Sequence, residues 1–478
     1  MYVLDALDFH TRMKPNDIAL VHEGGIATFQ FLRRSVRGAA ARVRAAGLNP
    51  DQPVGIYVGD PFLHLVLVLA LMHEAIPSFS GHPNYDPPPE GPAFGGYLCD
   101  RPMPFMTGAT IVSVDKSWAA PRQQNDPPIE RRSFKSAQSL VRIAASSGTT
   151  GVQKPVGLSA ELVDRSMEFP AKIGSLGEHP SITMIGLSSS LGFRHQLGHL
   201  QLGNPQVLVS GRLDAVTAIL RHQVQFLTAS PAQLQSIMAV VEQNAMRLPS
   251  LKHVRIAGSA VSPLMILRVR TRLCPNVTGD YGATEVGMIA EAPAELMERF
   301  PGCAGFVHPW NQVEIVDEAD LPLPAGTDGI VRIRSKSIVT SYLGEHAENQ
   351  TAFKNGWFYP GDLGSLSPEG LLVIAGRATE IINAGGVKVS PNLINNVLTS
   401  VHGIADAASF GVDFPDRPTE IWAAVVAPRE FDEKALIETC ISTLNNRAPR
   451  RIVRVEQIPR NTMGKILTAE LRKQVIGR

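Results

Sequence analysis

Residues 224–273 read VQFLTASPAQLQSIMAVVEQNAMRLPSLKHVRIAGSAVSPLMILRVRTRL, and this stretch decides the fold class. Short β-branched runs alternate in it with apolar residues at helical spacing, which predicts strands at 224–228 and 253–257 and helices at 231–243 and 262–273. The same alternation covers 207–222, where a strand-like run precedes a helical pattern. Strands and helices in this order form a parallel sheet covered on both faces, and such sheets bind ligands where their strands end.

The segments outside this stretch extend the αβ pattern. Towards the N-terminus, the sequence predicts an amphipathic helix over 30–47, a buried strand over 54–59 and a helix over 62–73. Residues 82–104 are so rich in proline and glycine that we expect a surface excursion without regular structure. Residues 310–375 carry short strand-like runs separated by turn residues, which predicts a small antiparallel sheet or barrel. The rest of the chain returns to a mixed αβ pattern.

Composition and charge exclude several classes of protein. The chain has 478 residues, which suggests about three domains, or one large domain with a smaller partner. Its 45 lysines and arginines nearly balance its 44 aspartates and glutamates, so it lacks the positive field of a dedicated nucleic-acid binder. With 44% apolar and 19% charged residues, we expect a folded chain with a large core.

The cysteines and the apolar runs predict where the protein acts. The four cysteines lie too far apart to form a CxxC pair, which favours a reducing compartment over a zinc knuckle or a disulfide scaffold. Residues 1–17 lack the basic and apolar regions of a signal peptide. The longest apolar run, 65–72, is far shorter than the ~20 residues that cross a bilayer. We therefore expect a cytoplasmic protein without a membrane span.

A loop rich in glycine and hydroxyl residues follows the strand-like run at 140–145. It reads Ser146-Ser147-Gly148-Thr149-Thr150-Gly151-Val152-Gln153-Lys154. Such a loop offers a polyphosphate many backbone and hydroxyl donors, little bulk and one nearby cation. It is not a Walker A loop, because that motif would require glycine where Gln153 stands. Taken alone, it could also be a plain turn.

Four further motifs follow along the chain. Residues 280–285 (DYGATE) offer an aromatic face for a purine and hard oxygen donors for Mg²⁺. In residues 356–363 (GWFYPGDL), a carboxylate after a Pro-Gly turn can accept both hydroxyls of a ribose. Residues 376–391 read GRATEIINAGGVKVSP, and residues 459–467 (PRNTMGKIL) put a lysine on a tight turn. Each of these motifs alone could be an ordinary loop.

The five motifs, in this order and at these separations, resemble the adenylate-forming superfamily of acyl-CoA synthetases, peptide-synthetase adenylation domains and firefly luciferase. The resemblance covers nearly the whole chain. It implies an α/β fold with a large N-terminal domain (1–376) of two αβ subdomains plus a small β-barrel. A hinge (377–380) and a mobile α+β C-terminal domain (381–478) would follow.

The resemblance also implies an activity, that of an AMP-forming carboxylic acid–thiol ligase. Such an enzyme joins a small organic acid to ATP, with Mg²⁺, to give acyl-AMP and pyrophosphate. It then passes the acyl group to coenzyme A, or to the phosphopantetheine of an acyl or peptidyl carrier protein. A carboxylate is a poor electrophile, and its mixed anhydride with AMP supplies a stabilised leaving group. The first transfer brings two anions together, so cations and oriented donors must offset their repulsion.

Each motif residue gains an implied nucleotide role. The β- and γ-phosphates would be held by Ser146, Ser147, Gly148, Thr149, Thr150, Gly151 and Lys154. The adenine would be flanked by Gly258, Ser259, Ala260, Asp280, Tyr281 and Gly282, and the ribose hydroxyls would be bound by Asp362 and Arg377. Three residues would be catalytic: Thr284 at the α-phosphate, Glu285 as the Mg²⁺ ligand, and Lys465 between the attacking carboxylate and the α-phosphate.

The remaining implied roles concern the acid, the thiol and the hinge. The acyl pocket would be formed by Phe193, Gly258, Gly282 and Met288. The hinge would include Thr379 and Glu380, and the thiol tunnel would be lined by Gly385 and Gly386. The chain departs from the family where the phosphate loop ends in Gln153-Lys154-Pro155 instead of Pro-Lys-Gly. It departs again at 187–193 (LSSSLGF), which lacks the usual aromatic-His pair beside the acyl pocket.

Several alternatives stay open. Residues 443–478 hold nine lysines and arginines and two glutamates, a net charge of +7, which suits a solvated face, coenzyme A phosphates or an acidic carrier protein. His195 and His199 have the i, i+4 spacing of metal ligands, but we expect core or pocket-wall histidines. Arg194 could meet a second substrate carboxylate if it points inward, although a solvated arginine is the favoured expectation. A nucleotide-binding regulator without turnover is the alternative from another class. The sequence identifies neither the acid nor the oligomeric state.

Overall fold

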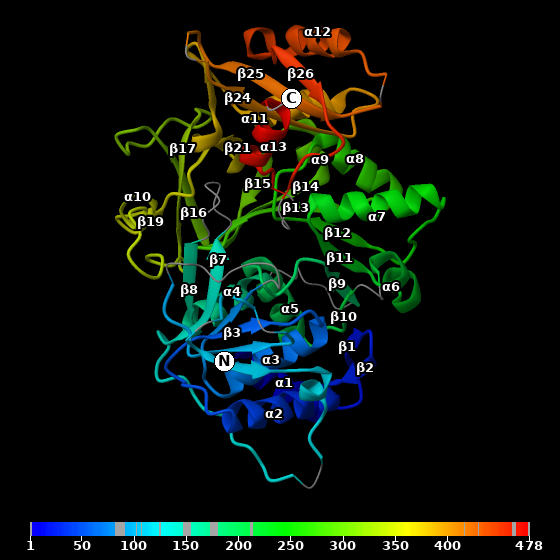
Figure 1. Cartoon of the computed structure of the whole chain (residues 1–478), viewed down its shortest axis with the longest axis vertical. Coiled ribbons are helices and arrows are strands. Elements are labelled where there is room, and N and C mark those ends of the chain that lie inside the picture. The colour runs from blue at the N-terminus through cyan, green and yellow to red at the C-terminus, as the bar shows by residue number, and fades with distance from the viewer. Residues whose placement is uncertain are drawn as a thin grey trace.

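The computed structural model describes residues 2–81, 91–101, 103–106, 108–123, 126–146, 154–172, 180–210, 214–414, 416–428, 430–460 and 465–476. Figure 1 shows the N-terminal helices in blue at one end of the molecule and the C-terminal elements in orange and red at the other. Three sheets of three or more strands and one separate two-stranded hairpin organise these residues. The fold is the α/β class predicted from 224–273.

The first subdomain is a six-stranded sheet packed against helices. Its order is β6 (Thr110–Ser113), β5 (Gly96–Cys99), β3 (Val54–Tyr57), β4 (Ser78–Ser80), β7 (Leu140–Ser146) and β8 (Lys154–Ser159), parallel except for the β7–β8 pair. The helices are α1 (Tyr2–Met13), α2 (Phe29–Ala45) and α3 (Pro61–His73), with a short 3-10 helix at Lys116–Ala119. Helix α3 is buried on all sides, as its unbroken apolar run requires.

Four strands of this sheet, β4, β5, β6 and β8, were not predicted. Residues 82–104 were expected to lack regular structure, yet β5 is a fully buried inner strand of four residues. The strand was not predicted because its apolar run is short and lies among prolines and glycines. Strand β8 contains Pro155 and Gly157, and it occupies the edge of the sheet, where a missing backbone N–H removes no ladder bond. Residues 82–90 lie outside the described part of the chain.

The second subdomain contains the parallel sheet predicted from the repeating strands and helices. Its order is β13 (Val277–Ala283), β12 (His253–Ile256), β11 (Phe226–Ala229), β9 (Ser181–Thr183), β10 (Gln206–Val207), β1 (Ile18–His22) and β2 (Gly25–Thr28), and all pairs are parallel except β1–β2. Its helices are α4 (Ala160–Lys172), α5 (Ser190–Leu202), α6 (Ala215–His222), α7 (Pro231–Gln243) and α8 (Pro263–Arg272). Serine N-caps followed by proline begin α7 and α8, which explains the sharp starts visible in the sequence.

The same sheet continues into an antiparallel region. It contains β14 (Gly287–Pro293), α9 (Ala294–Arg299), β15 (Cys303–Val307), β16 (Asn311–Val316), β17 (Gly329–Ser335), α10 (Asn349–Ala352), β18 (Phe353–Lys354), β19 (Trp357–Phe358), β20 (Asp362–Leu366) and β21 (Leu371–Arg377). Among the described strands, the pairings run from β14 through β15, β21, β20 and β17 to β16 and β19 without closing into a ring. The predicted barrel detail is therefore not confirmed, whereas the antiparallel sheet is.

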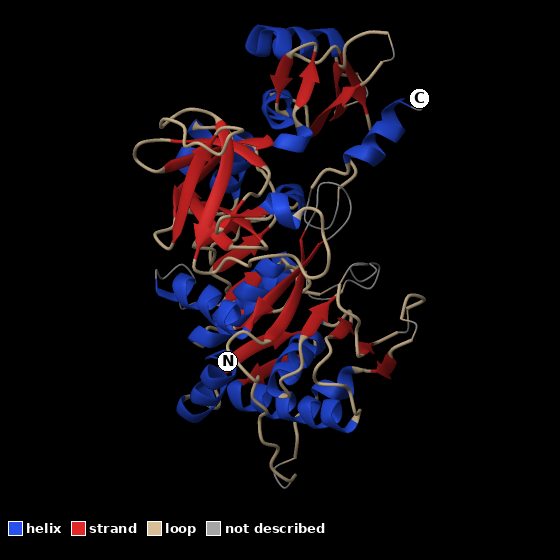
Figure 2. Cartoon of the chain, turned by 90° about the vertical axis from the view of Figure 1, so that its left-hand side faces the viewer, coloured by secondary structure: helices blue, strands red, loops and turns tan. Residues whose placement is uncertain are grey.

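The C-terminal elements form an α+β unit that Figure 2 shows above the rest of the molecule. After a 3-10 turn at Ala378–Glu380 come the hairpin β22 (Ile382–Ala384) and β23 (Val387–Val389), then α11 (Pro391–Ser400), β24 (Asp406–Val412), β25 (Glu420–Val426), α12 (Glu433–Leu444), a 3-10 turn at Asn445–Arg447, β26 (Arg451–Arg454) and α13 (Thr468–Ile476). Strands β24, β25 and β26 form one sheet with its own hydrophobic core. The domain boundaries at 376 and 381 stay predictions.

Two further sequence expectations concern cysteines and membranes. All four cysteines are buried and free. Within the described residues, no helix has both the length and the apolar character needed to span a membrane.

Candidate active site

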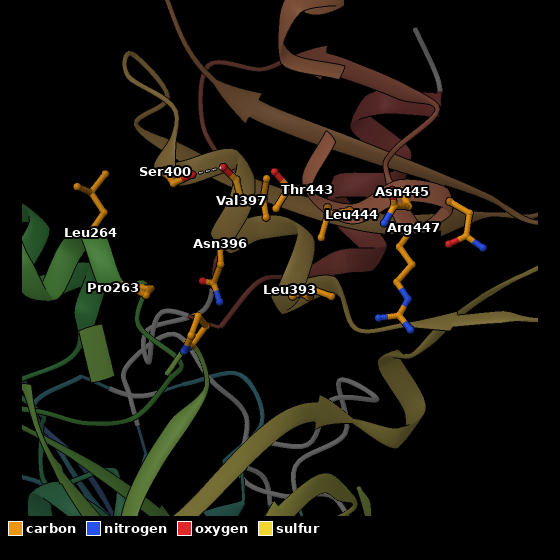
Figure 3. A pocket seen from close by; sticks show the side chains of 12 residues that line it. Pro263, Leu264, Leu393, Asn396, Val397, Ser400, Thr443, Leu444, Asn445 and Arg447 are labelled. Carbon is orange, nitrogen blue, oxygen red and sulfur yellow. Dashed lines mark hydrogen bonds between the residues drawn. The ribbon is translucent and has the colours of Figure 1, made fainter. Parts of the chain in front are cut away.

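A cavity of about 560 Å³ lies at the carboxyl end of β13, where the two N-terminal subdomains meet the C-terminal unit. Its lining includes residues of β7, α5, β13 and β14, and Lys465 from the segment before α13. A parallel sheet places ligands at this position, because the loops leaving its strands diverge there. A second cavity, of about 710 Å³, separates α8 from α11 and the turn at Asn445–Arg447 (Figure 3). None of the predicted site residues is among those that line this second cavity.

Asp362 is the buried acceptor at one side of the first cavity. It stands at the start of β20, directly across the β20–β21 ladder from Arg377. The Arg377 Nε lies 2.8 Å from Asp362 Oδ1, and the Tyr281 hydroxyl donates to Oδ2. Burial raises the pKa of Asp362, although Arg377 and the Tyr281 hydrogen bond oppose that rise. The carboxylate is thus oriented from two sides and faces the cavity.

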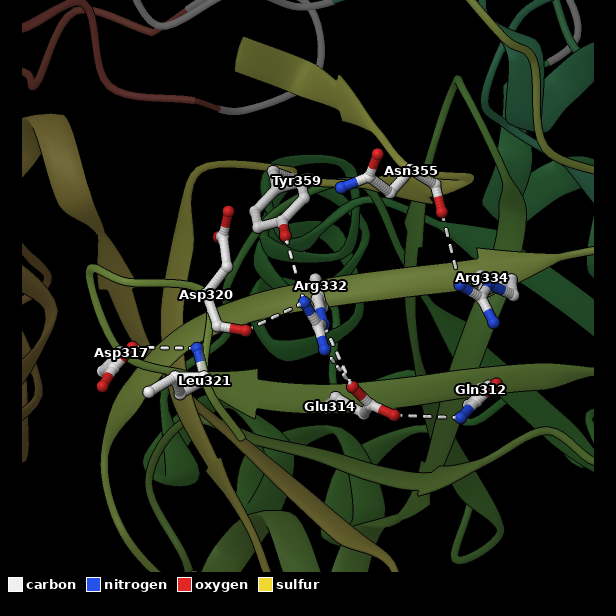
Figure 4. Close-up of polar contacts among 9 residues, drawn as sticks. All are labelled: Gln312, Glu314, Asp317, Asp320, Leu321, Arg332, Arg334, Asn355 and Tyr359. Atoms are coloured by element: carbon white, nitrogen blue, oxygen red, sulfur yellow. Dashed lines mark hydrogen bonds and ion pairs between the residues drawn. The ribbon is translucent and has the colours of Figure 1, made fainter. Parts of the chain in front are cut away.

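An arginine of β17 fixes the segment that precedes Asp362. Arg332 donates to Glu314 Oε2 of β16 from Nη2 at 2.6 Å and to the Tyr359 hydroxyl from Nη1 at 3.3 Å, as Figure 4 shows. Its guanidinium also lies over the Trp357 ring, 4.6 Å from the centroid. Tyr359 lines the cavity three residues before Asp362. The antiparallel region therefore positions the ribose acceptor predicted from residues 356–363.

Glu285 is a second buried carboxylate in the cavity. Its Oε1 accepts a hydrogen bond of 2.9 Å from the Tyr342 hydroxyl. Burial raises the pKa of Glu285, and its backbone hydrogen bond and Tyr342 are the main opposing contributions. Lys154 lies above the Tyr342 ring with its Nζ 3.1 Å from Glu348 Oε1. A carboxylate and a cation thus flank the same tyrosine.

Lys465 enters the cavity from the C-terminal unit. Burial lowers the pKa of its ammonium and Arg377 lowers it further, whereas Asp362, Glu380 and Glu285 raise it. Burial likewise raises the pKa of Glu380, which follows the cavity-lining Thr379. The lysine therefore meets three carboxylates and one guanidinium from the N-terminal part and the inter-domain turn.

The cavity brings together most of the predicted residues that the structure describes. Its lining contains Ser146, Lys154, Gly258, Asp280, Tyr281, Gly282, Thr284, Glu285, Met288, Asp362, Arg377, Thr379 and Lys465. Ser147, Gly148, Thr149, Thr150 and Gly151 lie outside the described residues. The lining does not include Glu380, Ser259 or Ala260, nor Gly385 and Gly386, which form the turn between β22 and β23.

Phe193 is placed differently from the expectation. It was predicted to line the acyl pocket, but it is buried in the main hydrophobic core and does not line the cavity. Its ring lies under the guanidinium of Arg142, whose Cζ is 4.8 Å from the ring centroid. Helix α5 turns its next two residues, Arg194 and His195, towards the cavity instead. One position along a helix changes the side chain's direction by about 100°.

Arg194 is therefore a site residue that the favoured sequence expectation missed. It is 8% exposed, and its Nη2 donates to the backbone oxygen of Thr284 at 3.2 Å. Helix α5 is buried almost all round, so its polar residues cannot reach solvent. His195 and His199 are buried too, as expected, and the described residues contain no group of three or more His, Cys, Asp or Glu that could hold a metal ion.

Two family models match the chain. The AMP-binding enzyme model matches residues 103–343, and the AMP-binding enzyme C-terminal domain model matches residues 393–465. The chain belongs to the AMP-binding enzyme family. Membership of the adenylate-forming superfamily, predicted from the five motifs, is thereby confirmed.

Relatives of known activity include coenzyme A ligases. The chain is 26% identical to an indoleacetate–CoA ligase of Aromatoleum aromaticum, over 77% of this chain and 75% of the relative. It is 23% identical to a 2-succinylbenzoate–CoA ligase of Listeria monocytogenes, over 98% of both chains.

Solved structures share the fold over nearly the full length. An O-succinylbenzoate coenzyme A synthetase from Bacillus subtilis, in complex with ATP and magnesium, matches with a TM-score of 0.84 at 20% identity, over 98% of this chain and 99% of that one. An amide bond synthetase from Marinactinospora thermotolerans matches with a TM-score of 0.82 at 22% identity, over 98% and 99% of the two chains.

Proposed function

We propose that the protein is an AMP-forming carboxylic acid–coenzyme A ligase. The observation that carries the proposal is the convergence of Asp362, Glu285 and Lys465 on one cavity from three distant segments. The full-length likeness to a CoA ligase of Listeria monocytogenes supports the same reaction. A small carboxylic acid and ATP would be the first two substrates.

In the first half-reaction, this chain's residues would bind and orient ATP. Asp362, held by Arg377 and Tyr281, presents a buried acceptor suited to ribose hydroxyls. Lys154 supplies a cation, and Lys465 brings a second one to a cavity that is rich in carboxylates. Lys465 would offset the repulsion between the acid's carboxylate and the α-phosphate. An ammonium on a flexible stem suits a group that must also leave the site.

The donor set fits a magnesium ion that is shared with the triphosphate. Tyr342 donates to one Glu285 oxygen, so the other can bind a cation, and the Thr284 hydroxyl is a further hard donor. A Mg²⁺ ion typically takes only one or two carboxylates beside phosphates and water. When bound, it would neutralise charge on the phosphates.

The second half-reaction would need a different orientation of the C-terminal unit. We propose the boundaries 1–376 and 381–478 for the two domains, with a hinge at 377–380 that includes Thr379 and Glu380. The cavity of about 710 Å³ between α8 and α11 leaves these parts loosely packed there, which favours movement. Rotation would withdraw Lys465 and bring the Gly385–Gly386 turn to the thiol path. Gly386 has no neighbour within 4 Å of a hypothetical Cβ.

Acid-dependent exchange of labelled pyrophosphate into ATP tests the first half-reaction. We expect exchange with at least one acid in a panel of aromatic, straight-chain and dicarboxylic acids. Absence of exchange with every acid, although ATP binds, would instead favour the nucleotide-binding regulator.

The acceptor is tested separately with coenzyme A, a phosphopantetheine-loaded carrier protein and a primary amine. We expect acyl-CoA. Product with the carrier alone would support the carrier-loading alternative, and product with the amine alone would support amide synthesis. We propose a cytoplasmic location, which the four unpaired cysteines favour.

A further inference from the structure

Arg194 occupies a defined place in the cavity. The N-cap Ser189 begins α5, and Gly192 lets the first turn pack against the backbone of Ile185 and Gly186, where a Cβ would collide with carbonyl oxygens. This packing aims Arg194 at β14, where its Nη1 lies against Gly287. The residue after Gly287 is Met288, one of the four predicted acyl-pocket residues, and it lines the cavity too. The guanidinium thus lies in the part of the cavity that would hold the acid.

The guanidinium of Arg194 has no direct ion-pair partner, although Glu285 is near enough to raise its pKa. No carboxylate of the described residues lies within ion-pair distance of it, and its Nε has no hydrogen-bond partner. Two other cationic side chains of the cavity do have carboxylate partners, since Arg377 is paired with Asp362 and Lys154 with Glu348. Burial lowers the pKa of Arg194 to about 10, so it remains a cation at neutral pH. A buried cation with unmet donors is costly unless a ligand supplies an anion.

Neighbouring polar groups are also unsatisfied. The Ser190 hydroxyl and both ring nitrogens of His195, which line the same cavity from α5, have no partner among the described residues. Both oxygens of Asp280 lack a hydrogen bond as well, although Arg255 Nε lies 3.4 Å away. An acid with a purely apolar tail would leave the polar groups of Ser190 and His195 buried and unpaired. The lining from α5 is therefore built for a substrate that is polar beyond its reacting carboxylate.

We propose that Arg194 binds a second carboxylate on the substrate, so that the protein activates dicarboxylic acids. This inference rests on the proposed acid–CoA ligase activity and adds the substrate class. A planar guanidinium pairs with a carboxylate through parallel N–H donors, and Ser190 and His195 supply further donors nearby. A site built in this way rejects an analogue that lacks the bonded group far more strongly than an apolar pocket rejects a missing methylene.

Matched pairs of acids test the proposal in the full-length protein. Each dicarboxylic acid is compared with the acid that carries a methyl group in place of its second carboxylate, such as glutarate with pentanoate, adipate with hexanoate, and terephthalate with 4-methylbenzoate. For the best pair, kcat/KM of acid-dependent pyrophosphate exchange should favour the dicarboxylic acid by roughly 100-fold or more. The variant R194M should lose that preference, while its kcat/KM for the methyl-terminated acid stays level or rises.

Two controls separate selectivity from folding. R194K keeps a charge but not the planar fork, so it should retain part of the preference. R142M removes a buried arginine that does not line the cavity, and it should change both acids of a pair by the same factor. If R194M is unfolded by circular dichroism, the wild-type preference and R194K still decide the matter.

Two outcomes would overturn the proposal. One is a wild-type enzyme that uses methyl-terminated acids as well as or better than their dicarboxylic partners. The other is an equal loss of exchange with both acids in folded R194M, which would make Arg194 a general positioning residue. Failure of exchange with every acid would overturn the ligase assignment itself and is distinct from either result.

Discussion

Replacement of Lys465 by alanine should separate the two half-reactions. In the observed orientation, the ammonium is near enough to Asp362, Glu285 and Glu380 for all three carboxylates to raise its pKa. Without the ammonium, Arg377 is the one cation left among these described groups to balance the three carboxylates. ATP and the acid are both anions, so their entry would then meet more repulsion. We therefore expect formation of acyl-AMP to suffer far more than any step that needs a different domain orientation.

The size of the effect follows from Coulomb's law. At an effective dielectric constant of about 20, two unit charges about 4 Å apart interact by about 4 kcal/mol. Since about 1.4 kcal/mol corresponds to tenfold in rate, loss of the ammonium should slow acid-dependent pyrophosphate exchange roughly 10³-fold. The rate at which coenzyme A attacks supplied acyl-AMP should fall by less than about tenfold. The reason is that Lys465 offsets the repulsion between the carboxylate and the α-phosphate, which arises in the first half-reaction only.

The matched control is Lys473→Ala, which removes one positive charge from the same basic tail but on the exposed side of α13. It should leave exchange within about twofold of wild type. Exchange by Lys465→Ala within tenfold of Lys473→Ala would refute the role given to Lys465. So would an equal loss in both half-reactions.

Three further outcomes are expected. Gly386→Trp should leave pyrophosphate exchange intact and stop thioester formation, because the indole would fill the proposed thiol path; normal acyl-CoA formation measured by chromatography would contradict this. Glu285→Gln should raise the Mg²⁺ concentration that half-saturates exchange by about tenfold or more, since a neutral amide binds the cation less well; an unchanged magnesium titration would count against Glu285. Burial raises the pKa of Asp280 from 3.8 to about 7. Between about pH 4 and 7, the folded protein therefore keeps a proton on Asp280 that the unfolded chain has lost. The free energy of unfolding falls as pH rises through that window. At about 1.4 kcal/mol per pKa unit, the total loss is about 4 kcal/mol. Urea unfolding of Asp280→Asn should show a flatter pH dependence there, and a profile parallel to that of wild type would disprove the assignment.

Much of the fold could be predicted from patterns of neighbouring residues in the sequence. The serine caps and prolines that begin α7 and α8 fix those helices, and the β-branched runs before them fix β11 and β12. These features depend on neighbours within a few residues, so a reading of the chain finds them. Strand β5 was not predicted because its sequence, a glycine and three apolar residues between prolines, becomes a strand only when flanking strands supply the ladder bonds.

The candidate site divides in the same way. Asp362, Glu285 and Lys465 were predicted because each stands in a motif whose order along the chain is informative. Arg194 and Phe193 were placed wrongly because the direction of a side chain on α5 depends on how that helix is seated. The position of the helix depends on the close packing of Gly192 against the backbone of Ile185 and Gly186, a contact that no local sequence pattern reveals. The signal that could have predicted an inward Arg194 was a serine-capped helix that has no solvent-facing side.

The ion pair between Asp362 and Arg377 joins two events that a ligase must coordinate. Asp362 would face the nucleotide in the proposed reaction, and Arg377 is the last residue of β21, immediately before the turn at which the C-terminal unit is proposed to pivot. A rotation that begins at residue 378 would therefore move the guanidinium of Arg377, which orients the Asp362 carboxylate. Departure of the nucleotide and travel of the tail would then be mechanically linked through a single strand end, with no relay of intervening residues.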